Sequence, residues 1–258
     1  MERIGNNLAK KQPAILILAD FSDGSWHAID FAMRFLYTPE STLFILQTFQ
    51  NPNFGQLMVR NIIPRLKKIT KYELNVLRTK VLRHFKIKAK QIKLLSFNGE
   101  LVSILQNKLN LKYTYDIVIG TNSSFADSNT MQNLYVTKII NYSNSPLFIL
   151  PQMFEQKEGK KILLVANPFK RLSLQVKDRI LSICEKTNSE LDILFVIEKD
   201  SQEIGKEEKA FFEKCFEGIK YTINYTKNTS VSKGIKNYVK NNYKDLIIIE
   251  KNQPEENP

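Results

Sequence analysis

The sequence has few of the residues that build metal centres and disulfide frameworks. It contains two cysteines, Cys184 and Cys215, and two histidines among its 258 residues. The cysteines stand far apart with no histidine or cysteine at ligand spacing, which favours reduced and unligated thiols. The two histidines have no acidic residue nearby at metal-binding spacing. We therefore expect no metal site and no disulfide framework.

Long apolar runs are also lacking. No run approaches the roughly 20 residues that a membrane-spanning helix needs. The amino end, residues 1–14, is polar and then enters a predicted strand, which is unlike a signal peptide. These features predict a cytoplasmic protein without a membrane partner.

Local catalytic and phosphate-binding motifs are missing as well. Neither G-x-S-x-G, G-x4-G-K-[ST] nor G-x-G-x-x-G occurs in the sequence. No local Ser-His-Asp or Cys-His arrangement is present. We therefore predict no catalytic residue and expect that the protein is not an enzyme.

Positive charge is present in excess and is unevenly distributed. The net charge is +12, and residues 1–151 carry 19 Lys and Arg against 9 Asp and Glu, compared with 19 against 17 in residues 152–258. The segment Arg60 to Lys93 holds 12 bases and one acid, Glu73. Such a segment is either a footprint for nucleic acid or another polyanion, or a solvated helix face. Aromatic residues do not alternate with the bases, as they would in a groove for single strands, which favours the solvated face.

Apolar runs of strand length alternate with segments of helical periodicity. Pro64 is predicted to lie at or near a helix start, because proline fits the first turn. Alternation of this kind favours a parallel sheet with helices on both faces. The predicted strands are 14–20, 43–49, 91–97, 116–119 and 146–150, and the predicted helices are 22–36, 64–85, 99–111 and 129–142.

The pattern then repeats after a polar linker at residues 152–160. Three segments have counterparts, with 15–22 matching 162–169, 41–49 matching 189–197, and 115–119 matching 244–248. The difference in residue number between matching segments is 147 or 148 for the first two pairs and 129 for the third. The second copy is therefore shorter, and we predict that the shortening lies in the helix over residues 203–216. The duplication predicts two tandem doubly wound α/β domains, 1–151 and 161–258. The second ends in a polar tail and is expected to lack its last helix and strand.

Two stretches resemble the universal stress protein family. A hydrophobic strand ending in Asp20, followed by Phe21-Ser22 and an amphipathic helix, is similar to the family's opening. A strand ending in Gly120-Thr121, a spacer, a helix and S-P-L-F-I-L-P at 145–151 is similar to its closing segment. The resemblance implies a five-stranded parallel α/β fold of the adenine nucleotide alpha hydrolase-like type. It also implies ATP binding in one branch, and commonly dimers that pair through the fifth strand.

The family's ATP-binding motif is only partly present. The ATP-binding members carry an acid at the end of the first strand and the motif G-x2-G-x9-G-[ST] after the fourth strand. In this sequence the acid corresponds to Asp20, and the first glycine of the motif corresponds to Gly120. The other two glycines fall on Ser123 and Asn133, and the hydroxyl position falls on Leu134. Glycines let a backbone approach phosphates closely, and a leucine offers no hydrogen bond to a phosphate oxygen. We therefore expect that the family's ATP binding is lost and that no cofactor is held.

The residues that remain at the motif positions have two alternative interpretations, as a nucleotide site or as structural residues. If a nucleotide such as ATP or AMP is retained, Asp20, Gly120, Asn122, Ser123 and Ser124 are the residues expected to bind it. Asp20 is either a ligand for a ribose or a magnesium ion, or a turn-forming residue. Gly120 is either a remnant of a phosphate loop or a strand terminator. In the second copy an asparagine replaces the acid and no glycine follows the fourth strand, so no second site is expected.

The segment Leu147, Phe148, Ile149 and Leu150 is predicted to lie at a sheet edge. An apolar edge strand favours pairing, here with the same strand of a second copy, unless the linker or the second half covers it. The leading hypothesis is a non-enzymatic tandem protein that acts in a stress response through contacts with a client protein. The alternatives are a module in the first domain that binds an adenine nucleotide or another small ligand, and a binder of polyanions or nucleic acid through residues 60–93.

Overall fold

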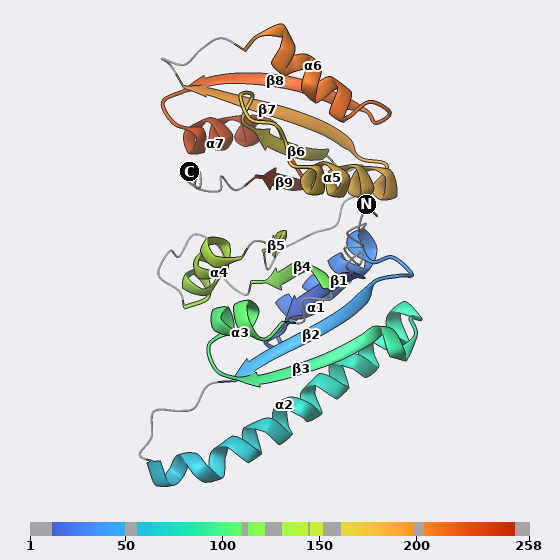
Figure 1. Ribbon diagram of the computed structural model, residues 1–258, viewed down its shortest axis with the longest axis vertical. Coiled ribbons are helices and arrows are strands. Elements are labelled where there is room, and N and C mark those ends of the chain that lie inside the picture. The colour runs from blue at the N-terminus through green and yellow to red at the C-terminus, as the bar shows by residue number, and fades with distance from the viewer. Residues whose placement is uncertain are drawn as a thin grey trace, which may run out of the picture. The chain divides into compact units, whose positions relative to one another are not determined.

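Continuous apolar runs form the central strands of two parallel sheets (Figure 1). The computed structural model describes residues 12–49, 56–109, 113–121, 131–143, 145–151, 161–198 and 204–250. The chain divides into two units, Met1–Phe154 and Glu155–Pro258. Strands and helices alternate in each unit, which confirms the predicted tandem α/β fold.

The first unit contains five parallel strands in the order β3-β2-β1-β4-β5. β5 is therefore an edge strand of the described sheet, as predicted. A short 3-10 turn, Ala89–Gln91, precedes β3. The elements in chain order are β1 (Gln12–Leu18), α1 (Asp23–Phe31) with a following π-helical turn (Ala32–Leu36), β2 (Thr42–Phe49), α2 (Gln56–Phe85), β3 (Ile92–Asn98), α3 (Leu101–Asn107), β4 (Tyr113–Gly120), α4 (Met131–Tyr142) and β5 (Leu147–Leu150).

The central strand β1 is buried on both faces, which explains its unbroken apolar run. Leu16 and Leu18 pack with Ile104 of α3 and Ile139 of α4. Because side chains alternate along a strand, Ile15 points to the opposite face, where it is also buried and where α1 and α2 contact the sheet. The sheet therefore has a helical layer on each side.

The second unit repeats this plan with four parallel strands in the order β8-β7-β6-β9. In the described part of the chain no helix or strand follows β9. α6 has 10 residues where α2 has 30, which confirms where the second copy is shortened. Its elements are β6 (Lys161–Ala166), α5 (Leu174–Thr187), β7 (Glu190–Glu198), α6 (Lys206–Cys215), β8 (Tyr221–Asn228), α7 (Val231–Asn241) and β9 (Leu246–Ile249).

One prediction about helix boundaries is wrong. Pro64 lies inside α2, which begins at Gln56, and does not lie near the helix start. A proline within a helix removes one backbone hydrogen bond and crowds the carbonyl group four residues earlier. Pro64 is exposed, and the helix continues through it.

Candidate functional site

The candidate ligand site lies at the carboxyl ends of β1 and β4, where parallel α/β sheets bind ligands. β1 and β4 are neighbours, and their last paired residues are Leu18 and Ile119. Asp20, two residues after β1, and Gly120, the last residue of β4, therefore lie at adjacent strand ends. Asn122, Ser123 and Ser124 lie outside the described residues.

The Asp20 carboxylate is bonded to the start of α1. Its Oδ1 atom accepts hydrogen bonds from the Ser22 backbone N–H at 3.0 Å and from the Ser25 hydroxyl at 2.6 Å, and also from the Ser22 hydroxyl. The Asp20 N–H donates in turn to Ser25 Oγ at 2.9 Å. Ser22 is the N-cap of α1 and accepts a hydrogen bond from the Ser25 N–H. Asp20 thus joins the end of β1 to the first turn of α1.

These hydrogen bonds also set the charge of Asp20. Burial acts to raise the pKa of Asp20, but the hydrogen bonds from Ser22 and Ser25 outweigh it and hold the pKa below its ordinary value. The carboxylate is therefore ionised at neutral pH, beside the positive end of the α1 dipole. This role in capping a helix accounts for the residue without a ligand.

Gly120 is required by packing between β4 and α1. A Cβ atom at this position would lie 1.9 Å from the carbonyl oxygen and 2.3 Å from the carbonyl carbon of Gly24, in the first turn of α1. The next residue, Thr121, is buried and donates to the Leu150 carbonyl oxygen from its N–H at 2.8 Å and from its hydroxyl at 3.2 Å. The close approach of two backbones explains this glycine without a phosphate.

The second unit fills the equivalent place with an acid. Glu250, the first residue after β9, has the position that Gly120, the last residue of β4, has in the first unit, as the strand pairing shows. The offset there is 130, so the predicted matching of 115–119 with 244–248 is wrong by one residue. Its Oε1 atom accepts a hydrogen bond at 3.2 Å from the N–H of Ser173, the N-cap of α5. Asn167, at the position of Asp20, accepts from the Phe169 N–H at 2.9 Å. A carboxylate of the chain therefore lies where the helix start could otherwise attract a phosphate.

The free edge of β5 is the second candidate site. Ile117 N–H donates to the Pro146 carbonyl oxygen at 2.9 Å, and the Thr121 N–H donates to that of Leu150. In a parallel ladder, every second residue bonds to the same neighbour, so the backbone groups of residues 147 and 149 face away from β4. Phe148 packs on Phe31 of α1 with ring centroids 5.7 Å apart. The strand is thus anchored to β4 on one side, and no described strand pairs with its other side.

The outer face of α2 is a third candidate. It lies within the basic segment 60–93, but its exposed apolar side chains were not predicted. Leu74 and Val81 are buried on the inner face of this helix. On the opposite face, Ile69, Tyr72 and Val76 are 54%, 71% and 53% exposed. Their spacing of three and four residues is a second apolar stripe, and a helical projection of the sequence could have found it.

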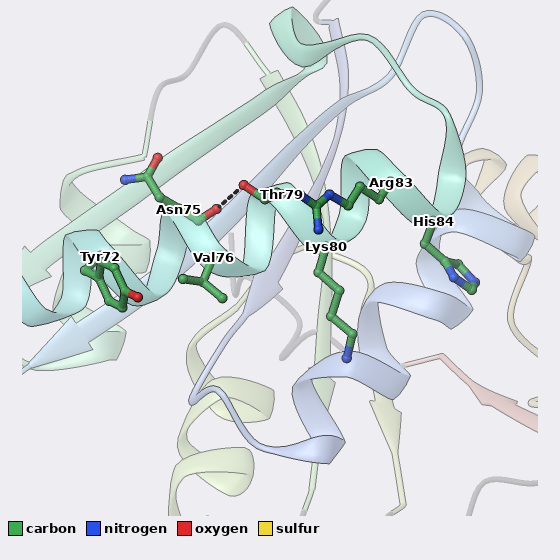
Figure 2. Close-up of a pocket in the computed structure, with 7 residues that line it drawn as sticks. All are labelled: Tyr72, Asn75, Val76, Thr79, Lys80, Arg83 and His84. Carbon is green, nitrogen blue, oxygen red and sulfur yellow. Dashed lines mark hydrogen bonds between the residues drawn. The ribbon is translucent and has the colours of Figure 1, made fainter.

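A hollow of about 670 Å³ lies on this face, lined by seven side chains of α2 between Tyr72 and His84 (Figure 2). Lys80 reaches towards α1, where its Nζ atom lies 3.8 Å from the centroid of the Trp26 ring. His84 packs edge-on against the same ring, with centroids 5.5 Å apart. The carboxyl-terminal part of α2 is therefore held against α1, while Tyr72 and Val76 remain exposed.

Within the described ranges, no three His, Cys, Asp or Glu side chains gather in a way that could hold a metal ion. None of the helices in these ranges combines the length and apolar character that crossing a bilayer requires.

Comparison with known proteins identifies the fold. No family model and no curated protein matches the sequence. The structure is similar to that of a universal stress protein from Archaeoglobus fulgidus DSM 4304, with a TM-score of 0.68 and 16% sequence identity over 92% of this chain and 86% of that one. The chain therefore has the fold of a universal stress protein, and the resemblance seen in the sequence is confirmed at the level of the fold.

Single-domain structures match about half of the chain. One is a protein of the universal stress protein family from Burkholderia pseudomallei, with a TM-score of 0.41 and 14% identity over 54% of this chain and 95% of that one. Another is the universal stress protein UspA from Lactobacillus plantarum, with a TM-score of 0.41 and 13% identity over 54% and 98% of the two chains. At TM-scores below 0.5, these two likenesses add nothing to the first.

Proposed function

We propose that this chain is a universal-stress-type protein that acts in a cytoplasmic stress response through protein contacts, without catalysis and without binding ATP. The observation that carries the proposal is that the family's phosphate-binding motif is incomplete after β4, where Ser123, Asn133 and Leu134 replace two glycines and the hydroxyl residue. In the second unit Glu250 takes the place of Gly120, and its carboxylate accepts a hydrogen bond from a backbone N–H at the start of α5.

Charge gives a physical reason for weak nucleotide affinity. A triphosphate that approached α5 would meet the Glu250 carboxylate, which the Ser173 N–H holds in place. Like charges within a few ångströms repel, and displacing Glu250 would also break its bond to the helix cap. In the first unit, Gly120 and Gly24 are already in backbone contact.

Calorimetry with ATP and Mg²⁺ tests the proposal on the full chain. We expect no binding at micromolar nucleotide concentrations. Micromolar binding that Asp20→Ala abolishes would contradict the proposal and would favour a nucleotide site at Asp20, Gly120, Asn122, Ser123 and Ser124. The same titration of Glu250→Ala reports whether the acid alone keeps a second site closed.

The contact surface within this proposal is the edge of β5, which pairs with the same strand of a second copy. Apolar side chains and outward-facing backbone groups at residues 147 and 149 are the features that favour strand addition. Ile149→Pro removes an N–H from the open edge and leaves the bonds to β4 intact. By sedimentation velocity we expect a dimer for the unmutated protein and a monomer for Ile149→Pro. A monomeric unmutated protein would overturn this part.

A further inference from the structure

We propose that the outward face of α2 binds an acidic segment of a partner protein that also carries apolar side chains. This face, called the outer α2 face below, is separate from the strand ends and from β5. It consists of the exposed apolar side chains Ile69, Tyr72 and Val76 and the exposed bases Arg65, Lys68, Lys71, Lys80 and Arg83.

The exposed apolar stripe is the first feature that supports a binding surface on α2. Isolated exposed hydrophobic residues are common on soluble proteins, but Ile69, Tyr72 and Val76 follow one another at helical spacing. Each keeps more than half of its surface in water. A continuous stripe of this kind is typical of a helix that another apolar surface covers.

The charges around the stripe support an acidic partner. Every exposed charged side chain between residues 65 and 83 is basic, and the one acid in this range, Glu73, is half-buried. Lys68 and Lys71 are three residues apart, so they are neighbours on the helix surface and their like charges repel each other. None of the ion pairs found among the described residues involves α2. An acidic partner would remove this repulsion.

The second unit provides an internal control. α6 lies between β7 and β8 as α2 lies between β2 and β3, yet its exposed charges have both signs, as with Lys206, Glu207 and Glu213. None of the large hydrophobic residues exposed in the described ranges lies on α6. The basic and apolar face is therefore a property of α2 and is not required by the fold.

The length of α2 also supports a role beyond covering the sheet. A helix of 30 residues is about 45 Å long, whereas the seven residues of β3 extend over about 23 Å. α2 runs alongside β3 and reaches past it (Figure 1). The helix is thus longer than is needed to cover its own sheet.

The apolar side chains favour a protein over a nucleic acid. Binding to phosphates needs cations and hydrogen-bond donors, to which Ile69 and Val76 contribute nothing. Single-stranded nucleic acids use rows of aromatic side chains for stacking, and Tyr72 is the one aromatic residue of the exposed stripe. An acidic segment with apolar residues matches both parts of the face.

The test uses the full chain and a synthetic peptide of about 18 residues, with leucine at helical spacing and glutamate between. Binding is followed by calorimetry and by the fluorescence of Trp26, the only tryptophan, which contacts Lys80. We expect micromolar affinity, at least about tenfold tighter than for a scrambled peptide. The double variant Tyr72→Ser and Val76→Ser should lose at least about tenfold in affinity.

Matched variants and probes separate the outcomes. Leu174→Ser removes an apolar side chain that is 76% exposed in the second unit, and it should leave the affinity unchanged. Lys71→Glu with Arg83→Glu should abolish binding of the acidic peptide and create binding of its lysine counterpart. Circular dichroism confirms that each variant is folded.

The proposal is overturned if the peptide binds no tighter than its scrambled form, or if Tyr72→Ser with Val76→Ser leaves the affinity unchanged. It is also overturned if duplex DNA binds more tightly than the peptide and is insensitive to that double variant, because the face would then be a polyanion surface. These variants leave Asp20, Glu250 and β5 intact, so failure here is distinct from failure of the proposed function.

Discussion

The two units share a plan but close the carboxyl ends of their central strands differently. In the first, Asp20 bonds to Ser22 and Ser25, and Gly120 lets β4 touch α1. In the second, the longer connection from β6 to α5 is held by Glu250 through Ser173. The comparison shows that groups of the protein itself can satisfy a helix start that in other α/β proteins binds a phosphate.

A core position differs as strongly between the units. Phe44 and Asp192 occupy equivalent places on β2 and β7. Phe44 packs edge-on against Tyr113, with centroids 5.0 Å apart. Asp192 instead accepts a hydrogen bond from Thr222 at 2.5 Å and pairs with the buried Lys244. The duplication thus preserved the strand pattern while one aromatic cluster became a charged network, or the reverse.

The largest expected loss of stability comes from a substitution that disrupts the packing between β4 and α1 in the first unit. Gly120→Ala should destabilise it by at least about 3 kcal/mol, because the new Cβ would overlap the Gly24 backbone. Denaturation followed by Trp26 fluorescence measures this, since the only tryptophan lies in this unit. The control is Gly205→Ala, where a Cβ would meet the flexible end of Glu208, with an expected cost below about 1 kcal/mol. Equal costs would contradict the packing role.

The next effect concerns the charged network of the second unit. Asp192→Ala should cost about 2–3 kcal/mol, because it leaves Lys244, whose side chain is 4% exposed, without its carboxylate. Hydrogen exchange followed by mass spectrometry should show faster exchange in peptides from β7 and β8. Glu190→Ala removes an exposed ion pair with Lys220 and should cost less than about 0.5 kcal/mol. A neutral Asp192→Ala would show that the network does not stabilise the unit.

The pH dependence of that effect follows from the pKa of Asp192. Burial acts to raise this pKa, but hydrogen bonds from Lys244 and Thr222 outweigh it and hold it below the ordinary value. The carboxylate therefore stabilises the unit above the unfolded-state pKa of about 4 and loses this effect as the pH falls through the folded-state pKa. The stability difference between the unmutated protein and Asp192→Ala should shrink in acid. A difference that stays constant from pH 7 to pH 3 would contradict the assignment.

The smallest expected effect compares the two strand-end caps. Asp20→Ala should cost about 1–2 kcal/mol, because it removes acceptors for Ser22 and Ser25. Asn167→Ala removes one hydrogen bond from the Phe169 N–H and should cost about 0.5–1 kcal/mol. Thermal unfolding of both variants measures the costs. A larger cost for Asn167→Ala would reverse the ranking on which the comparison rests.

Much of the fold could be predicted because strands buried on both faces of a parallel sheet have unbroken apolar sequences. β1, β2, β6 and β7 were found in this way. β8 was not identified, since its residues YTINYTKN alternate between half-buried and exposed at the sheet edge. The start of α2 was placed too late, because the preference of proline for a first turn says nothing about an exposed proline inside a long helix.

The candidate site could be predicted in position but not in its bonding. The order of the strands brought Asp20 and Gly120 to neighbouring ends, as expected from the sequence. Contact between Gly120 and Gly24 depends on how α1 packs on the sheet, and no local pattern reports that. The bond from Ser173 to Glu250 joins residues 77 positions apart and is likewise a product of tertiary structure.

Mass spectrometry of the purified, unmutated protein tests the central claim most directly. The protein is denatured and the released small molecules are compared with the amount of chain, with ATP and AMP as standards. We predict that neither nucleotide accompanies the protein, because the motif residues that would hold the phosphates are replaced in the first unit and Glu250 takes the place of Gly120 in the second. Release of ATP or AMP at close to one molecule per chain would contradict the account.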